Sequence, residues 1–317
     1  MTIICGTDFS EKAGSAARAA GAIAKQLALP LKLVHVFDVH GAEVGTRRVY
    51  DAVYETLRSR LGVLAEGLRV QFSIDVEPLV ETGVADEGLV ALAVSLDARL
   101  LVISSLGEKK QQRWLLGSVA ERVAQASPIP VLVVRDGGSI EAWARGERSL
   151  RVMVGAELTP SSKTALRWAC ELRAIAPCDL LVVQIAWPAE EHQRIGIPTP
   201  MPLDHLRPEL EQVLRRDLEQ WAGEQPGPGG TSFIVKPGWG RVDRHLTLLA
   251  AESKVDLVVV GTHQRAGIAR LWQGSVSRGV LHAADMSVAC IPRGETVDEA
   301  SVRPGTFEVA VEVIPTD

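Results

Sequence analysis

The chain is poor in cysteine, and the spacing of its cysteines argues against a thiol-based centre. Cys5, Cys170, Cys178 and Cys290 are the four among 317 residues, and no two of them form a Cys-x-x-Cys pair. Zinc sites and redox centres usually require such close pairs. Three of the four lie in or beside segments that we expect to be buried, where a reduced thiol acts as a small apolar side chain.

Long apolar runs and an excess of basic charge are also missing. No uninterrupted apolar run approaches the roughly 18 residues that a membrane span needs. Lys and Arg number 34 against 39 Asp and Glu, and the resulting formal net charge of −5 argues against a general binder of nucleic acid or anionic membranes. The chain starts at Met1 without a basic leader or a signal-type apolar block. We therefore expect a cytoplasmic globular protein with neither nucleic acid nor membrane as its partner.

The usual catalytic constellations are absent as well. The seven histidines are scattered, and none pairs with another at metal-ligand spacing. We find no nucleophile elbow and no P-loop of the form G-x4-G-K-[ST]. The sequence thus predicts no catalytic residue and no intrinsic metal site.

What the chain does contain is a repeated glycine-bearing unit. An apolar run from Leu100 ends at Ser104, Gly107 follows, and a further nine residues lead to Gly117-Ser118 and an amphipathic helix. A second apolar segment ends at Val134, so the order is strand, loop, helix, strand. Glycine allows backbone amides to approach an anion, and a helix start offers unpaired N–H groups. This unit predicts a phosphate-binding site.

The unit occurs twice, in the same order along the chain. The apolar run 257–260 leads to Gly261, and nine residues after Gln264 come Gly274 and Ser275. The beginnings also match, since residues 3–10 align with 152–159. We infer an internal duplication with copies at 1–136 and 150–293, a linker at 137–149 and a tail at 294–317.

Strands and helices alternate in each copy, which predicts a parallel sheet with helices on both faces. In the first copy we expect a helix that Asp8 or Ser10 caps, and a third strand in which Phe72, Ile74 and Val76 alternate. The proline-rich segment 188–202 reads as a loop. A helical turn at 140–145 is expected within the linker, and an alternating strand at 307–313 within the tail.

These residues resemble a family, the universal stress proteins of the UspA type, whose nucleotide-binding branch carries G-x2-G-x9-G-[ST]. The first copy reads Ser104-x2-Gly107-x9-Gly117-Ser118, and the second reads Gly261-x2-Gln264-x9-Gly274-Ser275. The opening Thr7-Asp8 and the closing 127–135 are also similar to the family. The resemblance implies two tandem five-stranded, doubly wound α/β domains that pack as a pseudo-dimer through their last strands.

The resemblance further implies an adenine nucleotide, ATP with or without Mg²⁺, as the ligand. The adenine would lie near Val36, and Thr7 and Asp8 would border the ribose or a metal ion. The phosphate would be held by Gly107, Gly117, Ser118 and the amides of Val119 and Ala120, with Ser104 at the first glycine position. Lys109, Lys110 and Arg113 would add positive charge.

The second copy departs more strongly from the pattern. Gln264 replaces the glycine expected next to the phosphates, and Glu157 is one methylene longer than Asp8. The corresponding positions are Glu157, Gly261, Gln264, Gly274 and Ser275, with Arg265 and Arg270 as the basic residues. We expect the first copy to be the better nucleotide site.

Three functions follow from these features. The first is an ATP-binding stress-response regulator that forms a homodimer or an intrachain pseudo-dimer. The second is a scaffold that binds no nucleotide and acts through protein contacts. The third, an ATPase or phosphotransferase, is disfavoured because no general base stands beside the phosphate loop.

Overall fold

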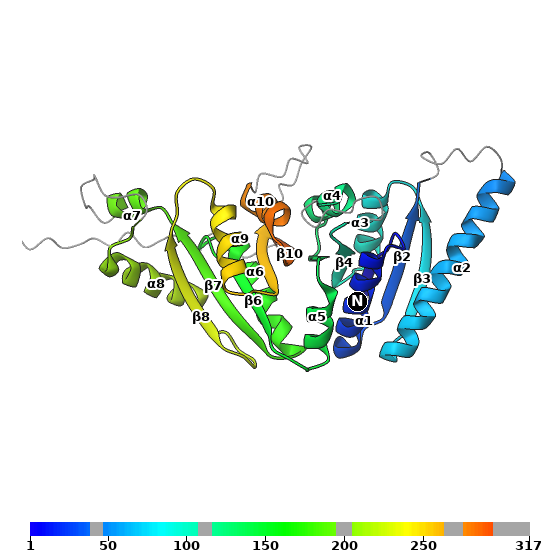
Figure 1. The fold of residues 1–317 in the computed structure, drawn as a ribbon, viewed down its shortest axis with the longest axis horizontal. Coiled ribbons are helices and arrows are strands. Elements are labelled where there is room, and N and C mark those ends of the chain that lie inside the picture. Colours follow the sequence, from blue (N-terminus) through cyan, green and yellow to red (C-terminus); the bar gives the residue numbers. More distant parts are fainter. Residues whose placement is uncertain (39–46, 107–115, 195–204, 263–274, 294–317) are drawn as a thin grey trace, which may run out of the picture.

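One mixed sheet runs through both copies (Figure 1). The computed structural model describes residues 1–38, 47–106, 116–194, 205–262 and 275–293. Its ten strands have the order β3-β2-β1-β4-β5-β10-β9-β6-β7-β8. In the first half β1 is the central strand, and in the second half its counterpart β6 is. The order in which the chain adds strands to the sheet reverses beside this central strand. In doubly wound sheets this reversal opens a crevice at the carboxyl ends of the strands.

The first half contains β1 (Ile3–Gly6), α1 (Glu11–Leu27), β2 (Leu31–Phe37), α2 (Arg47–Phe72), β3 (Val76–Thr82), α3 (Ala85–Ser95), β4 (Leu100–Ser104), α4 (Ser118–Ala126) and β5 (Val131–Val134). Helix α5 (Gly137–Ala144) joins it to the second half. That half contains β6 (Leu150–Gly155), α6 (Pro160–Glu171), a 3-10 turn (Leu172–Ala174), β7 (Cys178–Ala186), α7 (Pro188–Arg194), α8 (Pro208–Ala222), β8 (Thr231–Pro237), α9 (Val242–Glu252), β9 (Leu257–Thr262), α10 (Ser275–Ala283) and β10 (Ser287–Pro292).

Helices cover both faces of the sheet, and each face has one continuous core. Helices α1, α2, α5, α6 and α8 bury their apolar residues on one face. Helices α3, α4, α9 and α10 cover the other. Alanines line the buried side of α1, which therefore lies close to the sheet. The predicted α/β class with helices on both faces is confirmed.

The two halves join through their last strands, as predicted. β5 and β10 pair in antiparallel register, with Leu132 opposite Ala289 and Val133 opposite Val288. The strands within each half are parallel to one another. The antiparallel ladder is thus the line about which the two copies form a pseudo-dimer.

Ion pairs between α4 and α10 also join the two halves, across the pseudo-two-fold axis that relates the two copies. Glu121 Oε1 accepts from Arg278 (Nη2 at 3.0 Å) and from His282 Nε2 at 3.1 Å. Partial burial raises the pKa of Glu121, but the hydrogen bond and charge of His282 and the charge of Arg278 outweigh burial and lower it. Glu121 and Arg278 are each the fourth residue of their helix. Equivalent positions of the two copies therefore meet, with opposite charges.

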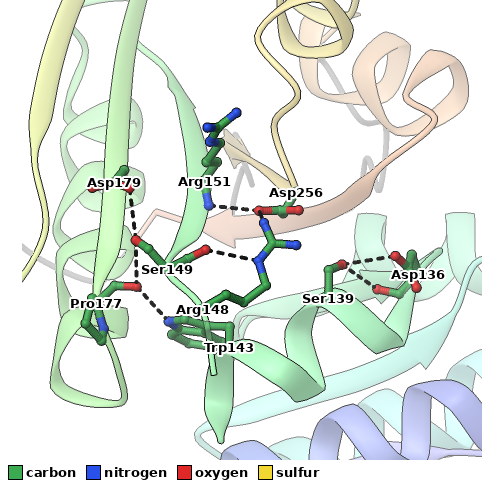
Figure 2. A network of polar contacts seen from close by, with 9 residues as sticks. All are labelled: Asp136, Ser139, Trp143, Arg148, Ser149, Arg151, Pro177, Asp179 and Asp256. Carbon is green, nitrogen blue, oxygen red and sulfur yellow. Dashed lines mark hydrogen bonds and ion pairs between the residues drawn. The ribbon is translucent and has the colours of Figure 1, made fainter. Parts of the chain in front are cut away.

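The segment expected as a linker is built into the core. Asp136 caps α5, because its Oδ1 accepts from Gly138 N at 3.0 Å. Trp143 is buried and donates from Nε1 to Pro177 O at 3.1 Å (Figure 2). Arg148 Nη2 then contacts Asp256 Oδ2 at 2.6 Å. The expected single turn at 140–145 was too short, because Asp136 starts the helix earlier and Trp143 anchors it.

Two further expectations were wrong. Phe72 ends α2 rather than starting a strand, because Leu61, Ala65, Leu68 and Phe72 share one buried helical face, and β3 begins only at Val76. Residues 188–194 form helix α7 instead of a loop, since Pro188 is favourable at a helix start and acidic residues follow in the first turn. The strand expected at 307–313 lies outside the described residues. Within the described part, no helix combines the length and apolarity required to cross a membrane.

Reversing the charges at the pseudo-two-fold axis tests this interface. Glu121→Arg should lower the free energy of unfolding by on the order of 1 kcal/mol, because two arginines then face each other. The double variant Glu121→Arg/Arg278→Glu should recover most of this loss. Urea unfolding of the four proteins in a double-mutant cycle measures the coupling. If the loss of stability in the double variant equals the sum of the losses in Glu121→Arg and Arg278→Glu, the assigned contact is contradicted.

Candidate functional site

A cavity of about 500 Å³ lies at the carboxyl ends of β1, β2 and β4, beside the starts of α3 and α4. This is the crevice that the strand order creates in the first half. Its lining comes from five elements or the turns that follow them: Gly6, Thr7, Asp8, Val34, His35, Val36, Ala85, Leu89, Ile103, Ser104, Ser105, Gly117, Ser118, Val119 and Ala120. Most of the lining is apolar, and its polar groups gather at the strand and helix ends.

The turn after β1 supplies the hydroxyl of Thr7 and the carboxylate of Asp8. Asp8 Oδ1 accepts from Ser10 N at 3.1 Å and from Ser10 Oγ at 2.6 Å, and Ser10 Oγ accepts from Ala13 N at 3.2 Å. Ser10 is therefore the N-cap of α1, not Asp8. Phe9, between the two, has φ 65°, a left-handed conformation that is uncommon for a residue other than glycine. Asp8 instead shapes the turn, at the edge of the cavity.

His35 holds this turn from β2. Its Nδ1 lies 2.8 Å from Thr7 O, so Nδ1–H is the donor to that carbonyl. The ring lies 4.5 Å from that of Phe9, and Arg60 Cζ lies 4.4 Å from the Phe9 ring centroid. Burial lowers the pKa of His35, Arg60 lowers it further, and the bond to Thr7 and the charge of Asp8 oppose this shift. The environment of the ring thus favours the neutral imidazole beside the cavity.

Both helices at the cavity start without a capping side chain. Val84 precedes α3 and Gly117 precedes α4, and neither makes a side-chain cap bond. By contrast, Ser10 caps α1. Gly117 N donates to Ser105 O at 2.7 Å, which fixes the entry into α4, and Ser118 is exposed at its first position. First-turn amides and the positive end of a helix dipole favour an anionic group at such a point.

The structure brings most of the predicted site residues of the first half to this one cavity. These are Thr7, Asp8, Val36, Ser104, Gly117, Ser118, Val119 and Ala120. Gly107 lies outside the described residues, as do Lys109, Lys110 and Arg113. Ser104 Oγ donates to Leu106 O at 3.1 Å, so its hydroxyl is bound by the backbone. The placement agrees with the expected site, and its binding role stays a prediction.

The second half builds the corresponding turn differently. Ser162 Oγ accepts from Glu157 N at 3.3 Å and from Thr159 N at 3.1 Å. A serine of α6 thus accepts the turn's backbone hydrogen bond that Asp8 accepts in the first half. A Cβ on Gly261 would lie 2.6 Å from Ser161 O, which explains this glycine by close packing of α6. Gln264, Gly274, Arg265 and Arg270 lie outside the described residues. Ser275 begins α10.

Sequence reasoning missed part of the lining: Gly6, Val34, His35, Ala85, Leu89, Ile103 and Ser105. Ala85 and Leu89 come from α3, which no motif of the sequence connects with the site. Only the sheet order, with β1 between β2 and β4, carries α3 to the crevice. His35 had a usable signal, since it directly precedes Val36 at the end of β2. No cluster of three His, Cys, Asp or Glu suited to a metal ion occurs in the described ranges.

Comparison with known proteins gives consistent matches over both halves. The model of the Universal stress protein family matches residues 1–135 and 149–292. Universal stress protein Rv2005c of Mycobacterium tuberculosis is 26% identical over 90% of this chain and 95% of its own length. A universal stress protein of Archaeoglobus fulgidus has a similar fold, with a TM-score of 0.64, 15% identity and coverage of 92% of this chain and 98% of its own.

The lowered pKa of His35 predicts a pH dependence of stability. Because the unfolded state binds the proton more readily, the contribution of neutral His35 is complete above pH 6.5 and decreases as the pH falls below 6.5 toward the folded-state pKa. We expect an NMR titration of the His35 ring to give a pKa below 6.5.

The variant His35→Gln carries the residue of the second half, since Gln184 occupies the equivalent strand position. Its free energy of unfolding should change less with pH just below 6.5 than that of the unmodified chain. The lowered pKa of Glu121 acts in a separate range, below 4.5. Equal slopes for the two proteins would contradict the assigned environment of His35.

Proposed function

The chain belongs to the universal stress protein family, and we propose that it is a stress-response regulator that binds ATP in the cavity of its first half. One observation carries the proposal. Residues expected at an adenine-nucleotide site from three distant segments of the sequence line one cavity of about 500 Å³. That volume is within the range of small-molecule sites, about 300 to 1,000 Å³.

The chemistry of the lining suits the parts of a nucleotide. Val34, Val36, Leu89 and Ile103 offer apolar surface to a base, and the ends of β1 and β2 offer backbone groups to its edge. The hydroxyl of Thr7 and the carboxylate of Asp8 are suited to ribose hydroxyls or to a Mg²⁺ that accompanies the phosphates.

The phosphates have a natural place at the start of α4. Gly117 leaves room for the chain of phosphates, Ser118 supplies a hydroxyl, and the amides of Val119 and Ala120 lie in the first turn. These groups bind and orient an anion. We propose binding without turnover, so that occupancy rather than hydrolysis is the signal.

The first half is the proposed site because its turn keeps the shorter acid. Asp8 borders the cavity and accepts the hydrogen bond from Ser10 N that shapes the turn. In the second half the corresponding hydrogen bond, from Thr159 N, goes to Ser162 and not to Glu157. The second half is therefore the poorer candidate for the same ligand. We expect about one nucleotide per chain.

Calorimetric titration of the nucleotide-free chain with Mg-ATP tests the proposal. Gly117→Lys should abolish binding, because the new side chain fills the phosphate end of the cavity. Gly117 has φ −71° and ψ 143°, so a larger residue adds no backbone strain there. The expected result is one site in the unmodified chain and none in the variant.

Gly67→Lys is the matched control. It adds the same charge on α2, where a Cβ would meet nothing within 4 Å, and should bind as the unmodified chain does. Two sites per chain would contradict the preference for the first half. No binding by the unmodified chain would refute the proposal and favour a scaffold that acts through protein contacts.

A further inference from the structure

Helices α3 and α4 form two opposite walls of the cavity, and the distance between them determines its width. Ala85 and Leu89 of α3 form one wall, and Val119 and Ala120 of α4 form the other. Both helices pack in one apolar core on the same face of the sheet, where side chains rather than backbone hydrogen bonds lie between them. Side chains that join the helices therefore determine the width of the cavity between them.

An ion pair joins the two walls directly. Arg122 Nε of α4 lies 2.8 Å from Asp86 Oδ2 in the first turn of α3. Asp86 is only 8% exposed, and its Oδ1 is buried without a hydrogen-bond partner in the described part of the chain. Arg122 is thus the charge partner of a buried carboxylate, and its hydrogen bond to Asp86 raises the pKa of the guanidinium.

The second half provides a natural comparison. Asp243 is the second residue of α9, as Asp86 is of α3, and it is also buried. Gly279 is the fifth residue of α10, as Arg122 is of α4. A Cβ on Gly279 would lie 2.0 Å from Asp243 Oδ2, so the backbone of α10 lies directly against that carboxylate.

Asp243 consequently takes its charge partner from elsewhere. Arg241, which precedes α9, binds it through Nε at 3.1 Å and Nη2 at 2.6 Å. In the first half the long side chain of Arg122 reaches from α4 to Asp86 on α3. In the second half the backbone of α10 at Gly279 lies directly against Asp243 on α9. At this one position the two halves therefore differ: a long side chain joins α4 to α3, whereas the backbone of α10 itself contacts the carboxylate on α9.

We infer that Arg122 is a positioning residue that keeps the first-half cavity open by bridging α4 to Asp86 on α3. This inference rests on the proposed function, because it assigns the width of the same nucleotide site. Arg122 contacts no ligand in this assignment and acts through the placement of Val119 and Ala120. A glycine at position 122 lets α4 approach α3 as α10 approaches α9.

The test uses the full-length chain with Asp86→Asn/Arg122→Gly. Replacing both partners avoids leaving a buried carboxylate unpaired, which by itself destabilises a protein strongly. We expect Mg-ATP to bind about tenfold more weakly or worse in calorimetric titration, a loss of about 1.4 kcal/mol. Arg122→Lys, which retains the ion pair and much of the length, should keep most of the affinity.

Gln125→Gly is the matched control on the same helix. It carries the same cost in helix propensity but its side chain bonds Glu121 on the α10 side, so affinity should stay within about twofold. Unchanged affinity in the double variant, or an equal loss in Gln125→Gly, would overturn the inference.

A second measurement keeps the inference separate from the proposed function. In crystal structures of the ligand-free proteins, the distance between α3 and α4 should be shorter in the double variant than in the unmodified chain. An unchanged distance would overturn the inference whatever binds. If the unmodified chain binds no Mg-ATP while the helices still close in the variant, the proposed function fails and the positioning role of Arg122 stands.

Discussion

The antiparallel pairing of β5 with β10 is the constraint on which the rest of the structure depends. It joins two parallel half-sheets into one sheet and lets each core continue from one half into the other. It also brings equivalent positions of the two copies together. A half that paired with a copy of itself would place Glu121 opposite Glu121, or Arg278 opposite Arg278. The opposite charges at this position favour pairing between unlike halves.

Away from that line, the backbone frame is kept while the side chains differ. Thr7 N donates to Val34 O, and Ala156 N donates to Val183 O, both at 2.8 Å, so the two turns are held alike. The left-handed residue is also kept, as Phe9 in one half and Leu158 in the other. A strained conformation that persists after its side chain has changed belongs to the architecture. The differences at the cavity therefore lie in side chains on a common scaffold.

The sequence was most informative where local pattern and tertiary structure agree. The strand at 100–104 and the helix that follows Gly117 begin and end where expected, because the apolar run and the helical spacing coincide there with burial. The prediction that Phe72 begins a strand was wrong because its apolar ring fits both a helical face and an alternating strand. The contribution of α3 to the cavity depends on sheet order, which no local pattern encodes. The pairing of Arg122 with Asp86 joins residues far apart in the sequence and was equally out of reach.

Helix α4 connects these observations, because its first turns make three kinds of contact. Residues 118–120 line the cavity, Glu121 binds α10 across the pseudo-two-fold axis, and Arg122 binds Asp86 on α3. A ligand can shift an equilibrium only by its difference in affinity for the two states. A nucleotide that displaced α4 would thus have to break both ion pairs, and one that fits the existing position of α4 would stabilise the state in which both are formed.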